Sequence, residues 1–498
     1  METEPVIDML IVGAGLAGVG AAVRFRRDLP GREMLILERR QQPGGTWDLF
    51  RYPGVRSDSD MFTLGFDFRP WTGAKSIADG ESIRRYVQDT VRDEGLEPCI
   101  RYGRRVVACD WSSADAVWRV RHVAEDGSDA CVTAARFLYM AAGYYDYDAG
   151  YMPEFAGRAD FGGTVIHPQH WPQAFDPRGR RIVVIGSGAT AVTLIPALAD
   201  AGAEVTMLQR SPTWMISRPA RDRFADIVRR LLPDKLAYGI VRARNIFLGR
   251  FFFRYARRKP AKVAKHLLAE AGRLLPPGYD LATHMTPRYN PWEERLCLVP
   301  DGDFFAAIRS GRARIETGHI DRFVPEGIRL ADGRTLAADT IVAATGLQLA
   351  LAGKAALSVD GVSVESGRLV SYKGLMFSGL PNYIQVFGYT NASWTLKADL
   401  CAAYAVRLTR ALEQRRADYA VAEADPAMPT EPMTDFSSGY FRRAEAILPR
   451  QGTAAPWRLN QDYYADRRIL LKQPIADGVL RFGRAGDRIA VPAPLAAE

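Results

Sequence analysis

Two glycine-rich stretches of this chain have the spacing that lets a backbone turn approach a phosphate group. The first, GAGLAG, holds Gly13, Gly15 and Gly18 directly after the apolar run Ile7–Val12, which predicts a buried parallel strand. Glycine permits the tight turn and the close approach, and the helix that follows offers free N–H groups to a pyrophosphate. Together with Ala17 in the same turn, these residues predict a dinucleotide site.

The residue that ends the next strand indicates the type of dinucleotide. A second apolar run, Met34–Leu37, ends at Glu38. A carboxylate there can accept hydrogen bonds from ribose hydroxyls and would repel a 2′-phosphate. The first site therefore fits FAD or NAD, and a strand–helix turn without a ligand is the alternative.

The second stretch, GSGATA, repeats the pattern after an apolar run at Arg181–Ile185. After the next strand, Arg210 and Ser211 stand where the first unit has its glutamate. Arginine can pair with a 2′-phosphate and stack on adenine, and serine can bond to the phosphate. This unit therefore predicts NADPH, against the alternative of a surface arginine. The turn residues, with alanine as a known variant of the third glycine, are Gly186, Ser187, Gly188, Ala189, Thr190 and Ala191.

Between the two units lies FGGTVIHPQHWP, residues 161–172, in which His167 and His170 are three positions apart. It could be a metal site, a catalytic base or a connector that couples two nucleotide sites. A metal would need further ligands, and the chain has six histidines in total, so no metal site is predicted. Simple packing or hydrogen bonding in a loop stays open for His170.

The cysteines limit where electrons from a reduced flavin could go. The five are scattered and form no CxxC or CxxxxC pair: Cys99, Cys109, Cys131, Cys297 and Cys401. A disulfide framework, a zinc site and a redox-active disulfide are therefore not expected. Molecular oxygen is the remaining common electron acceptor.

The composition is that of a globular protein with a large core. The chain has 498 residues, of which 47% are hydrophobic, and a net charge of +9. That charge fits an ordinary basic soluble protein, or attraction to phosphate-bearing cofactors or an anionic membrane surface. We find no apolar run of about 18 residues, no secretory signal and no nucleic-acid-binding motif, so a cytoplasmic protein without a nucleic-acid partner is predicted.

Both turns need parallel strands to hold them. The pattern predicts a long functional loop over Gln41–Thr72, a helix near Ser82–Glu94 and alternating strands around Val106–Ala134. Further buried strands are expected at Phe137–Ala142, Glu204–Gln209 and Thr340–Gly346. The expected fold class is α/β, with two Rossmann-like dinucleotide-binding domains, for FAD and NADP, and a helical insert.

The expected domain division follows the chain in five segments. Residues 1–150 form the first part of the FAD-binding domain, and residues 151–219 form the linker and the first part of the NADP-binding domain. The helical insert covers residues 220–290. Residues 291–345 return to the NADP-binding domain, and residues 346–498 complete the FAD-binding domain with the C-terminal region.

The stretch Phe247–His266 within the insert mixes aromatic and basic side chains. A basic amphipathic helix of this kind can lie on a membrane surface. Long basic side chains that cover a packed helix would give the same pattern, and packing is the favoured explanation. The sequence leaves peripheral contact with the inner face of the cell membrane open.

The stretch at 161–172 fits the pattern FxGxxxHxxxWP, which resembles the fingerprint of the Baeyer–Villiger monooxygenases within the flavin-containing monooxygenase superfamily. GGTWDLFRYPGVRSDSD, residues 44–60, looks like the flavin-contacting loop of that family, and GSGATAVTLIPALAD with LQRSPTW looks like its NADP half. HMTPRYNPWEERLCLVPDGD and GYTNASWTLKADL, at 284–303 and 388–400, resemble the mycobacterial ethionamide-activating subgroup. The resemblance covers nearly the whole chain.

The resemblance implies an FAD- and NADPH-dependent enzyme that takes one oxygen atom from O₂ through a C4a-peroxyflavin. A lipophilic ketone would become an ester or lactone, and a sulfide, thioamide or thiourea would be oxygenated at sulfur. Three alternatives remain: a sulfur- or nitrogen-oxygenating flavin monooxygenase with little ketone activity, an NADPH oxidase, and a catalytically idle flavoprotein. The substrate and the oligomeric state are not determined.

The resemblance also assigns residues. Arg295 matches the catalytic arginine, Asp58 the carboxylate that positions it, and His167 a residue that couples the two domains. Alternatives are a salt bridge of Arg295 with Glu293 or Asp303, and a loop cap for Asp58. The expected flavin contacts include Gly45, Thr46, Trp47, Arg56, Asp58 and Val106.

Two further positions leave questions open. Many family members have lysine before the catalytic arginine, but this chain has Glu294, which puts the strength of its NADPH preference in doubt. Trp394 lies either near the substrate or in the core.

Overall fold

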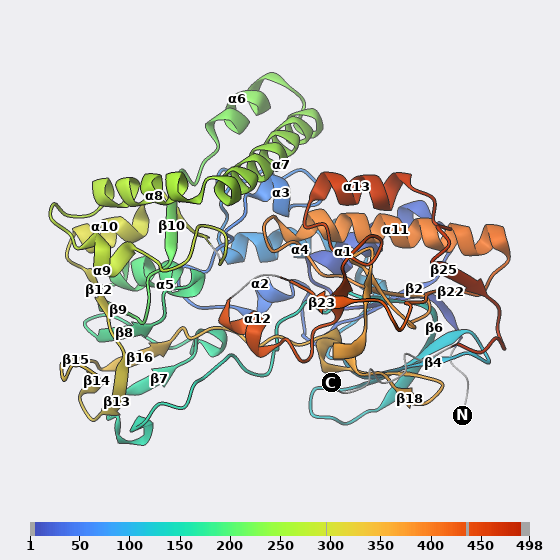
Figure 1. Cartoon of the computed structure of the whole chain (residues 1–498), viewed down its shortest axis with the longest axis horizontal. Helices are drawn as coiled ribbons and strands as arrows, with labels where there is room; N and C mark the ends of the chain where they lie inside the picture. Colours follow the sequence, from blue (N-terminus) through green and yellow to red (C-terminus); the bar gives the residue numbers. More distant parts are fainter. Residues whose placement is uncertain (1–4, 295, 435–437, 490–498) are drawn as a thin grey trace.

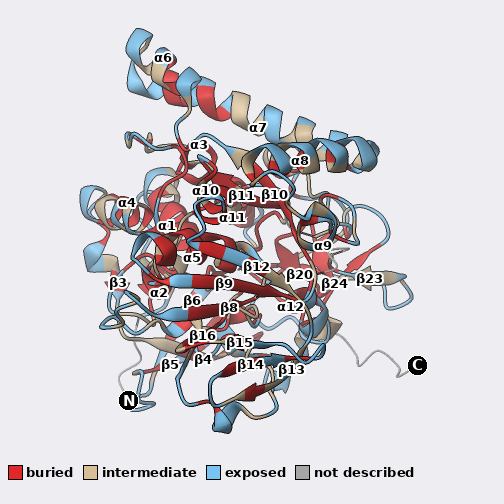
Figure 2. Ribbon diagram, turned by 90° about the vertical axis from the view of Figure 1, so that its left-hand side faces the viewer, coloured by how far each residue is buried: buried red, intermediate tan, exposed pale blue. Residues whose placement is uncertain are grey.

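Two β-sheets lie at opposite ends of the molecule, and helices cover them (Figure 1). The structure is a computed structural model that describes residues 5–294, 296–434 and 438–489. Figure 2 shows that the strands of both sheets run through the buried interior. This is the predicted α/β architecture, because each sheet holds one of the two strand–turn–helix units.

The larger sheet has nine strands in the order β18-β17-β4-β5-β6-β1-β2-β3, and β21 also pairs with β6. Strands β1, β2, β3, β6 and β21 are parallel, whereas β4 and β5 form antiparallel pairs beside them. The strands are β1 (Ile7–Val12), β2 (Met34–Leu37), β3 (Ile100–Arg101), β4 (Arg105–Ser112), β5 (Val117–Val123), β6 (Cys131–Met140), β17 (Ala356–Val359), β18 (Val362–Ser363) and β21 (Tyr383–Gln385).

The smaller sheet is parallel throughout, in the order β12-β9-β8-β16-β7. Its strands are β7 (Thr164–Ile166), β8 (Arg181–Ile185), β9 (Glu204–Gln209), β12 (Ala313–Thr317) and β16 (Thr340–Ala343). A three-stranded meander extends this end of the molecule, with β13 (Ile320–Val324), β14 (Gly327–Leu330) and β15 (Thr335–Ala337). Strands β10 (Trp214–Arg218) and β11 (Leu296–Pro300) form a separate parallel pair.

Three more two-stranded ribbons lie in the C-terminal part of the chain. They pair β19 (Ser371–Tyr372) with β20 (Met376–Phe377), β22 (Tyr419–Ala422) with β25 (Leu480–Gly483), and β23 (Thr430–Pro432) with β24 (Arg450–Gly452). The α-helices are α1 (Leu16–Asp28), α2 (Thr46–Leu49), α3 (Met61–Leu64), α4 (Gly80–Asp93), α5 (Ala189–Asp200), α6 (Arg223–Leu231), α7 (Asp234–Arg258), α8 (Pro260–Leu274), α9 (Leu281–Met285), α10 (Asp303–Arg309), α11 (Trp394–Arg415), α12 (Gly439–Arg443) and α13 (Tyr463–Lys472).

The predicted bounds of β1, β2, β8 and β9 are confirmed, because these apolar runs are buried on both faces as central parallel strands. Two expected strands end sooner than predicted, β6 at Met140 and β16 at Ala343. Ala142-Gly143 and Thr345-Gly346 follow these strand ends and lead into the two segments that cross between the sheets. The long loop predicted at Gln41–Thr72 contains the short helices α2 and α3.

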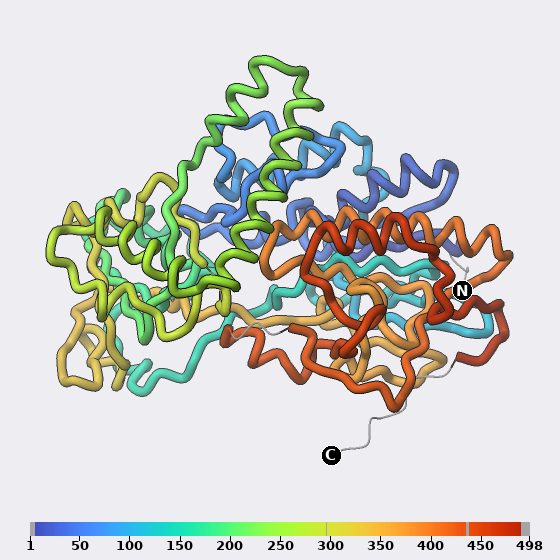
Figure 3. The backbone as a smooth tube through the Cα atoms, turned by 45° about the horizontal axis from the view of Figure 1, so that its top comes forward, coloured from blue at the N-terminus to red at the C-terminus, as the bar shows by residue number. Residues whose placement is uncertain are grey.

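The chain crosses between the sheets through two segments, residues 144–151 and 345–350. They run antiparallel and bond to each other: Asp146 N–H donates to Gln348 O at 2.9 Å, and Tyr151 N–H donates to Gly346 O at 3.0 Å. Figure 3 shows the two crossing segments side by side in the middle of the molecule.

The predicted insert is a group of helices, α6 to α9, between β10 and β11. Helix α7 packs against α3, which belongs to the flavin-contacting loop, and against α8. The far end of the α6–α7 pair projects from the body (Figure 1). Among the described helices, α7 included, none is both long and apolar enough to cross a membrane. We propose the five-segment domain division for the chain.

Candidate functional site

One cavity of about 1880 Å³ lies between the two sheets and is lined by both glycine-rich turns. Most residues predicted for cofactor binding are part of its wall: Gly13, Gly15, Ala17, Glu38, Gly45, Thr46, Trp47, Arg56, Asp58, Val106, Gly186, Ser187, Gly188, Ala189, Thr190, Arg210 and Ser211. Gly18, Ala191 and His167 do not line it. Arg295 lies outside the residues that the structure describes.

The first turn is shaped by two glycines that leave no room for a side chain. Gly13 has φ +101°, and a Cβ there would lie 2.7 Å from Ala141 O. A Cβ on Gly18 would lie 1.8 Å from Gly13 O, because α1 packs directly on the turn. Gly18 therefore packs against the turn and does not line the cavity.

The N-terminus of α1 opens toward the cavity. Its first residue follows Gly15, which has no side chain to cap the helix, and the first turn holds no acidic residue. The free N–H groups and the positive end of the helix dipole are thus left for an anionic group, as a pyrophosphate requires.

Glu38 is buried with 4% of its surface exposed, at the end of β2. Its carboxylate accepts from Ala14 N–H at 2.6 Å and from Arg40 N–H at 2.8 Å. Burial raises the pKa of Glu38, while these bonds act against that rise. The carboxylate is held beside the turn, in the position that a ribose would need.

The segment after Gly44 is fastened to the first turn. Gly44 N–H donates to Ala14 O at 3.0 Å, and a Cβ on Gly45 would lie 2.9 Å from Gly15 Cα. Thr46 begins α2 and bonds with the phenol of Tyr147.

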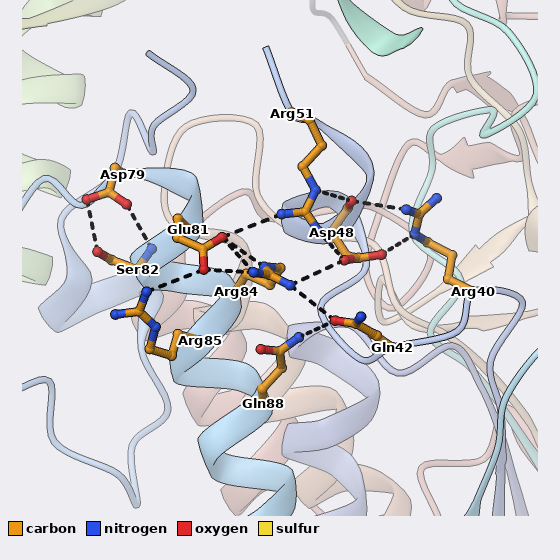
Figure 4. A network of polar contacts seen from close by, with 10 residues as sticks. All are labelled: Arg40, Gln42, Asp48, Arg51, Asp79, Glu81, Ser82, Arg84, Arg85 and Gln88. Atoms are coloured by element: carbon orange, nitrogen blue, oxygen red, sulfur yellow. Dashed lines mark hydrogen bonds and ion pairs between the residues drawn. The ribbon is translucent and has the colours of Figure 1, made fainter. Parts of the chain in front are cut away.

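A charged network holds the next turn (Figure 4). The buried carboxylate of Asp48 receives Arg40 Nε and Arg51 at 2.5 Å each, and Arg84 on α4 lies 4.0 Å away. Arg84 also pairs with Glu81 and bonds to Gln42 at 3.1 Å. The loop that carries Thr46 and Trp47 is therefore fixed against α4.

The second turn repeats the geometry of the first. Gly186 has φ +128°, and a Cβ there would lie 2.4 Å from Ala344 O, whereas a Cβ on Gly188 would meet no atom within 4 Å. Gly188 precedes the first residue of α5, whose first turn holds no acidic residue. Ala191 is fully buried in the core beneath the turn.

Arg210 and Ser211 follow β9 and line the cavity at the second turn. Ser187 Oγ donates to Ser211 O at 3.0 Å, which joins the end of the strand to the turn. Glu294 also lines the cavity, and burial raises its pKa, while Arg442 and Arg210 act in the opposite direction. A carboxylate is thus electrostatically coupled to the arginine predicted to bind a 2′-phosphate.

We expect Glu294→Lys to lower the KM for NADPH about 5- to 10-fold and to leave the KM for NADH nearly unchanged. The change replaces a charge that repels the 2′-phosphate with one that attracts it. Steady-state kinetics with both nucleotides measure the effect. Arg210→Ala is the matched variant and should raise the KM for NADPH about 10- to 100-fold. An unchanged NADPH-to-NADH ratio in both variants would contradict the assignment.

The loop with Arg56 and Asp58 faces the cavity from the side of the larger sheet. The Arg56 guanidinium pairs with the carboxylate of Asp303 at the start of α10. Burial raises the pKa of the Tyr52 phenol to about 12, with a hydrogen bond from Thr190 in opposition and Asp58 within electrostatic reach. The loop therefore ties the two domains together at the cavity wall.

Asp303 was one alternative partner for Arg295, and its carboxylate binds Arg56. The other alternative made Asp58 a loop cap. The cap of α3 is Asp60, which accepts from Phe62 N–H at 3.1 Å and from Thr63 N–H at 3.2 Å. Asp58 itself is exposed to the cavity.

His167 contacts the crossing segments and does not line the cavity. Its Nε2 lies 3.3 Å from Gly346 O, its Nδ1 accepts from Gln169 N–H at 3.2 Å, and its ring lies against Gly150. His170 Nε2 lies 3.0 Å from Asp148 O. Both histidines thus bond to crossing segments, and we propose His167 as a positioning residue, not a group that touches the reacting atoms.

We expect His167→Ala to destabilise the fold by about 1–2 kcal/mol and to slow turnover, because it loosens both crossing segments. Burial lowers the pKa of His167 below its ordinary value of 6.5. The folded state then binds fewer protons than the unfolded state, so stability falls as the pH drops below about 6.5. Chemical unfolding between pH 7.5 and 5.5 gives the free energy of unfolding at each pH. This free energy should fall less steeply with decreasing pH in His167→Gln than in the wild type. An equal pH dependence of the free energy of unfolding in the variant and the wild type would contradict this role.

Most of the aromatic side chains that line the cavity were not predicted from the sequence. Tyr144 stacks on Trp394 with ring centres 4.9 Å apart, and Phe387 and Phe441 complete the cluster. Trp394, for which a place near the substrate and a place in the core were both open, packs on this cluster and also lines the cavity. Tyr144 follows the Ala-Gly pair after β6, and that position was the available signal.

No group of three or more His, Cys, Asp or Glu side chains that could hold a metal ion occurs within residues 5–294, 296–434 and 438–489. None of the five cysteines forms a disulfide within the described residues. The cavity wall thus combines the two glycine-rich turns, a few charged side chains and aromatic side chains such as Tyr144 and Trp394.

Comparison with known proteins gives three kinds of match. Residues 10–230 match the family described as pyridine nucleotide-disulphide oxidoreductase. The FAD-containing monooxygenase EthA of Mycobacterium tuberculosis is 48% identical over 480 residues, 96% of this chain and 98% of the relative. The probable FAD-binding monooxygenase AlmA of Acinetobacter baylyi is 44% identical over 490 residues, 98% of each.

The solved structures show the fold. Oxidized steroid monooxygenase bound to NADP has a TM-score of 0.77 at 20% identity and covers 96% of this chain and 100% of that one. Cyclohexanone monooxygenase in its closed form has a TM-score of 0.70 at 19% identity, and the match covers 84% of this chain and 87% of that one. These matches confirm the predicted two-dinucleotide α/β fold.

Proposed function

The chain belongs to the FAD-containing monooxygenases, and from this premise we propose that it inserts oxygen into ketones in the Baeyer–Villiger manner and also oxygenates sulfur. FAD and NADPH are its cofactors. The observation that carries the proposal is that one continuous cavity has both dinucleotide turns in its wall. It would allow the nicotinamide, the flavin and a substrate to meet in one space.

The residues present fit both cofactors. Glu38 and the first turn suit FAD, and Arg210 with the second turn suits the 2′-phosphate of NADPH. Bound FAD, reduced by NADPH, would supply the means to activate oxygen. The chain supplies the cavity and the charges around it.

Arg295 is proposed as the cation that stabilises negative charge on the substrate oxygen. Guanidinium stays protonated and donates several directed hydrogen bonds. Asp58 is proposed to orient that guanidinium. Tyr144 and Trp394 give the cavity an aromatic wall, and Phe387 and Phe441 pack against Tyr144 without lining the cavity. This wall favours a lipophilic ketone or sulfur compound.

One assay separates the candidate functions. The FAD-loaded enzyme is given NADPH and O₂ with a cyclic ketone and a thioether together, and ester, sulfoxide and hydrogen peroxide are quantified. We expect both organic products, with peroxide as the minor product. Sulfoxide without ester would favour the sulfur-oxygenating alternative, and peroxide alone would favour an NADPH oxidase.

We further propose that the enzyme works in the cytoplasm and touches the inner face of the cell membrane. The supporting observation is the net charge of +9, because anionic lipids attract basic surfaces. Light scattering would give the oligomeric state.

A further inference from the structure

The α6–α7 pair concentrates exposed hydrophobic side chains. Within the described residues, fourteen large hydrophobic side chains are exposed, and nine of them lie on these two helices. The largest exposed fractions on the pair are 75% for Leu231, 60% for Phe251 and 56% for Phe247. Single exposed hydrophobic residues are ordinary, but a contiguous group of this kind marks an interaction site.

Five of the six exposed large hydrophobic side chains of α7 form one stripe. Leu236, Ile240, Phe247, Phe251 and Tyr255 are spaced by four, seven, four and four residues, which places them on one face of a helix. We call them the outer stripe. Most of the pair is coloured as exposed in Figure 2.

The opposite face of α7 is fixed to the body. The buried guanidinium of Arg242 donates to Phe62 O and Gly65 O at 2.8 Å each and to Asp399 Oδ2 at 2.9 Å. Asn245 Nδ2 donates to Asp60 Oδ1 at 3.0 Å. Because the inner face already has its partners, the outer stripe is available for something else.

The charge around the stripe indicates the partner. Residues 223–259 contain eleven Lys and Arg and two Asp. A hollow of about 220 Å³ on α7 is lined by Phe247, Phe251, Tyr255, Arg250, Arg254 and Arg258. Arg250 and Arg254 share the carboxylate of Asp462, and Arg242 and Arg244 pair with Asp399 and Asp222. Seven further Lys and Arg in the segment, against its two Asp, make this surface positive. A second copy of so positive a surface would be repelled, whereas an anionic bilayer offers both acyl chains and negative headgroups.

We propose that the α6–α7 pair lies in the interface of an anionic lipid membrane, with the outer stripe at the level of the upper acyl chains. The proposal specifies the surface for the membrane contact proposed above. It also links that surface to the site, because Ile246, Phe252 and Phe253 of α7 line the cavity. A lipophilic substrate dissolved in the bilayer would then meet the helix that borders the cavity.

The test is flotation of the FAD-loaded full-length protein with vesicles of phosphatidylcholine alone or with an equal part of phosphatidylglycerol. We expect binding to the anionic vesicles, weakened by salt. The variant Phe247→Ser/Phe251→Ser should bind roughly a hundredfold more weakly, because each phenyl ring that no longer enters the bilayer costs about tenfold in affinity. The matched control Val132→Ser/Val362→Ser changes side chains that are 51% and 53% exposed on β6 and β18, and should bind as the wild type does.

Flavin absorbance and product formation from a water-soluble ketone check that each variant is folded, and neither depends on lipid. Absence of wild-type binding, or unchanged binding of the double phenylalanine variant, would overturn the proposal. Equal binding to neutral vesicles would overturn the choice of an anionic membrane. A mass that rises with protein concentration and falls in the double variant would instead identify the stripe as a contact between copies. Loss of product formation in the wild type with intact vesicle binding would count against the proposed function alone.

Discussion

Gly188→Ala is expected to raise the KM for NADPH about 10- to 100-fold while the protein keeps its fold and its FAD. Gly188 has φ −77°, which alanine adopts freely, and its added Cβ would meet no protein atom within 4 Å. The methyl group would instead occupy the space where the pyrophosphate must approach the backbone. The free energy of unfolding should stay within about 0.5 kcal/mol of the wild type.

A variant two residues away gives the contrast. In Gly186→Ala the Cβ would lie 2.4 Å from Ala344 O on a backbone with φ +128°, so the fold itself should be destabilised. Nucleotide titration and thermal unfolding of both variants separate the two effects. If Gly188→Ala bound NADPH as tightly as the wild type does, the second turn would not be the pyrophosphate site.

Asp58→Ala is expected to reduce organic product formation about 100-fold while NADPH is still consumed. By the proposed role, loss of the carboxylate would leave Arg295 without the group that orients it, and oxygen would leave as hydrogen peroxide. The measurement is the ratio of product to peroxide, together with the rate of anaerobic FAD reduction by NADPH, which should hardly change. Asp58→Asn should retain part of the product formation, because the amide keeps the shape of the side chain and an acceptor oxygen.

The alternative role for Asp58 gives a different result. A residue that only stabilised the loop would lower the melting temperature without changing the ratio of product to peroxide. Asp60→Asn serves as the comparison, since Asp60 caps α3 and also lines the cavity. A similar ratio in Asp58→Ala and the wild type would remove Asp58 from the reaction.

The sequence determined the local parts of this protein. The turns at Gly13 and Gly186 were predicted because glycine spacing, a preceding apolar run and a following helix are all encoded within about 30 residues. The same local logic gave Glu38 and Arg210 at the ends of β2 and β9. Trp394, in contrast, could not be assigned, because a tryptophan in a core and one at a cavity wall have the same local pattern.

Tertiary structure decided which distant parts meet. Arg56 faces Asp303 across 247 positions, and His167 bonds to Gly346 across 179. The outer stripe of α7 is exposed because Arg242 and Asn245 fix the other face to the body, a choice between two apolar faces that periodicity alone does not make. Pairing between remote segments depends on the summed packing of the whole chain, whereas a turn or a helix end depends on its neighbours in sequence.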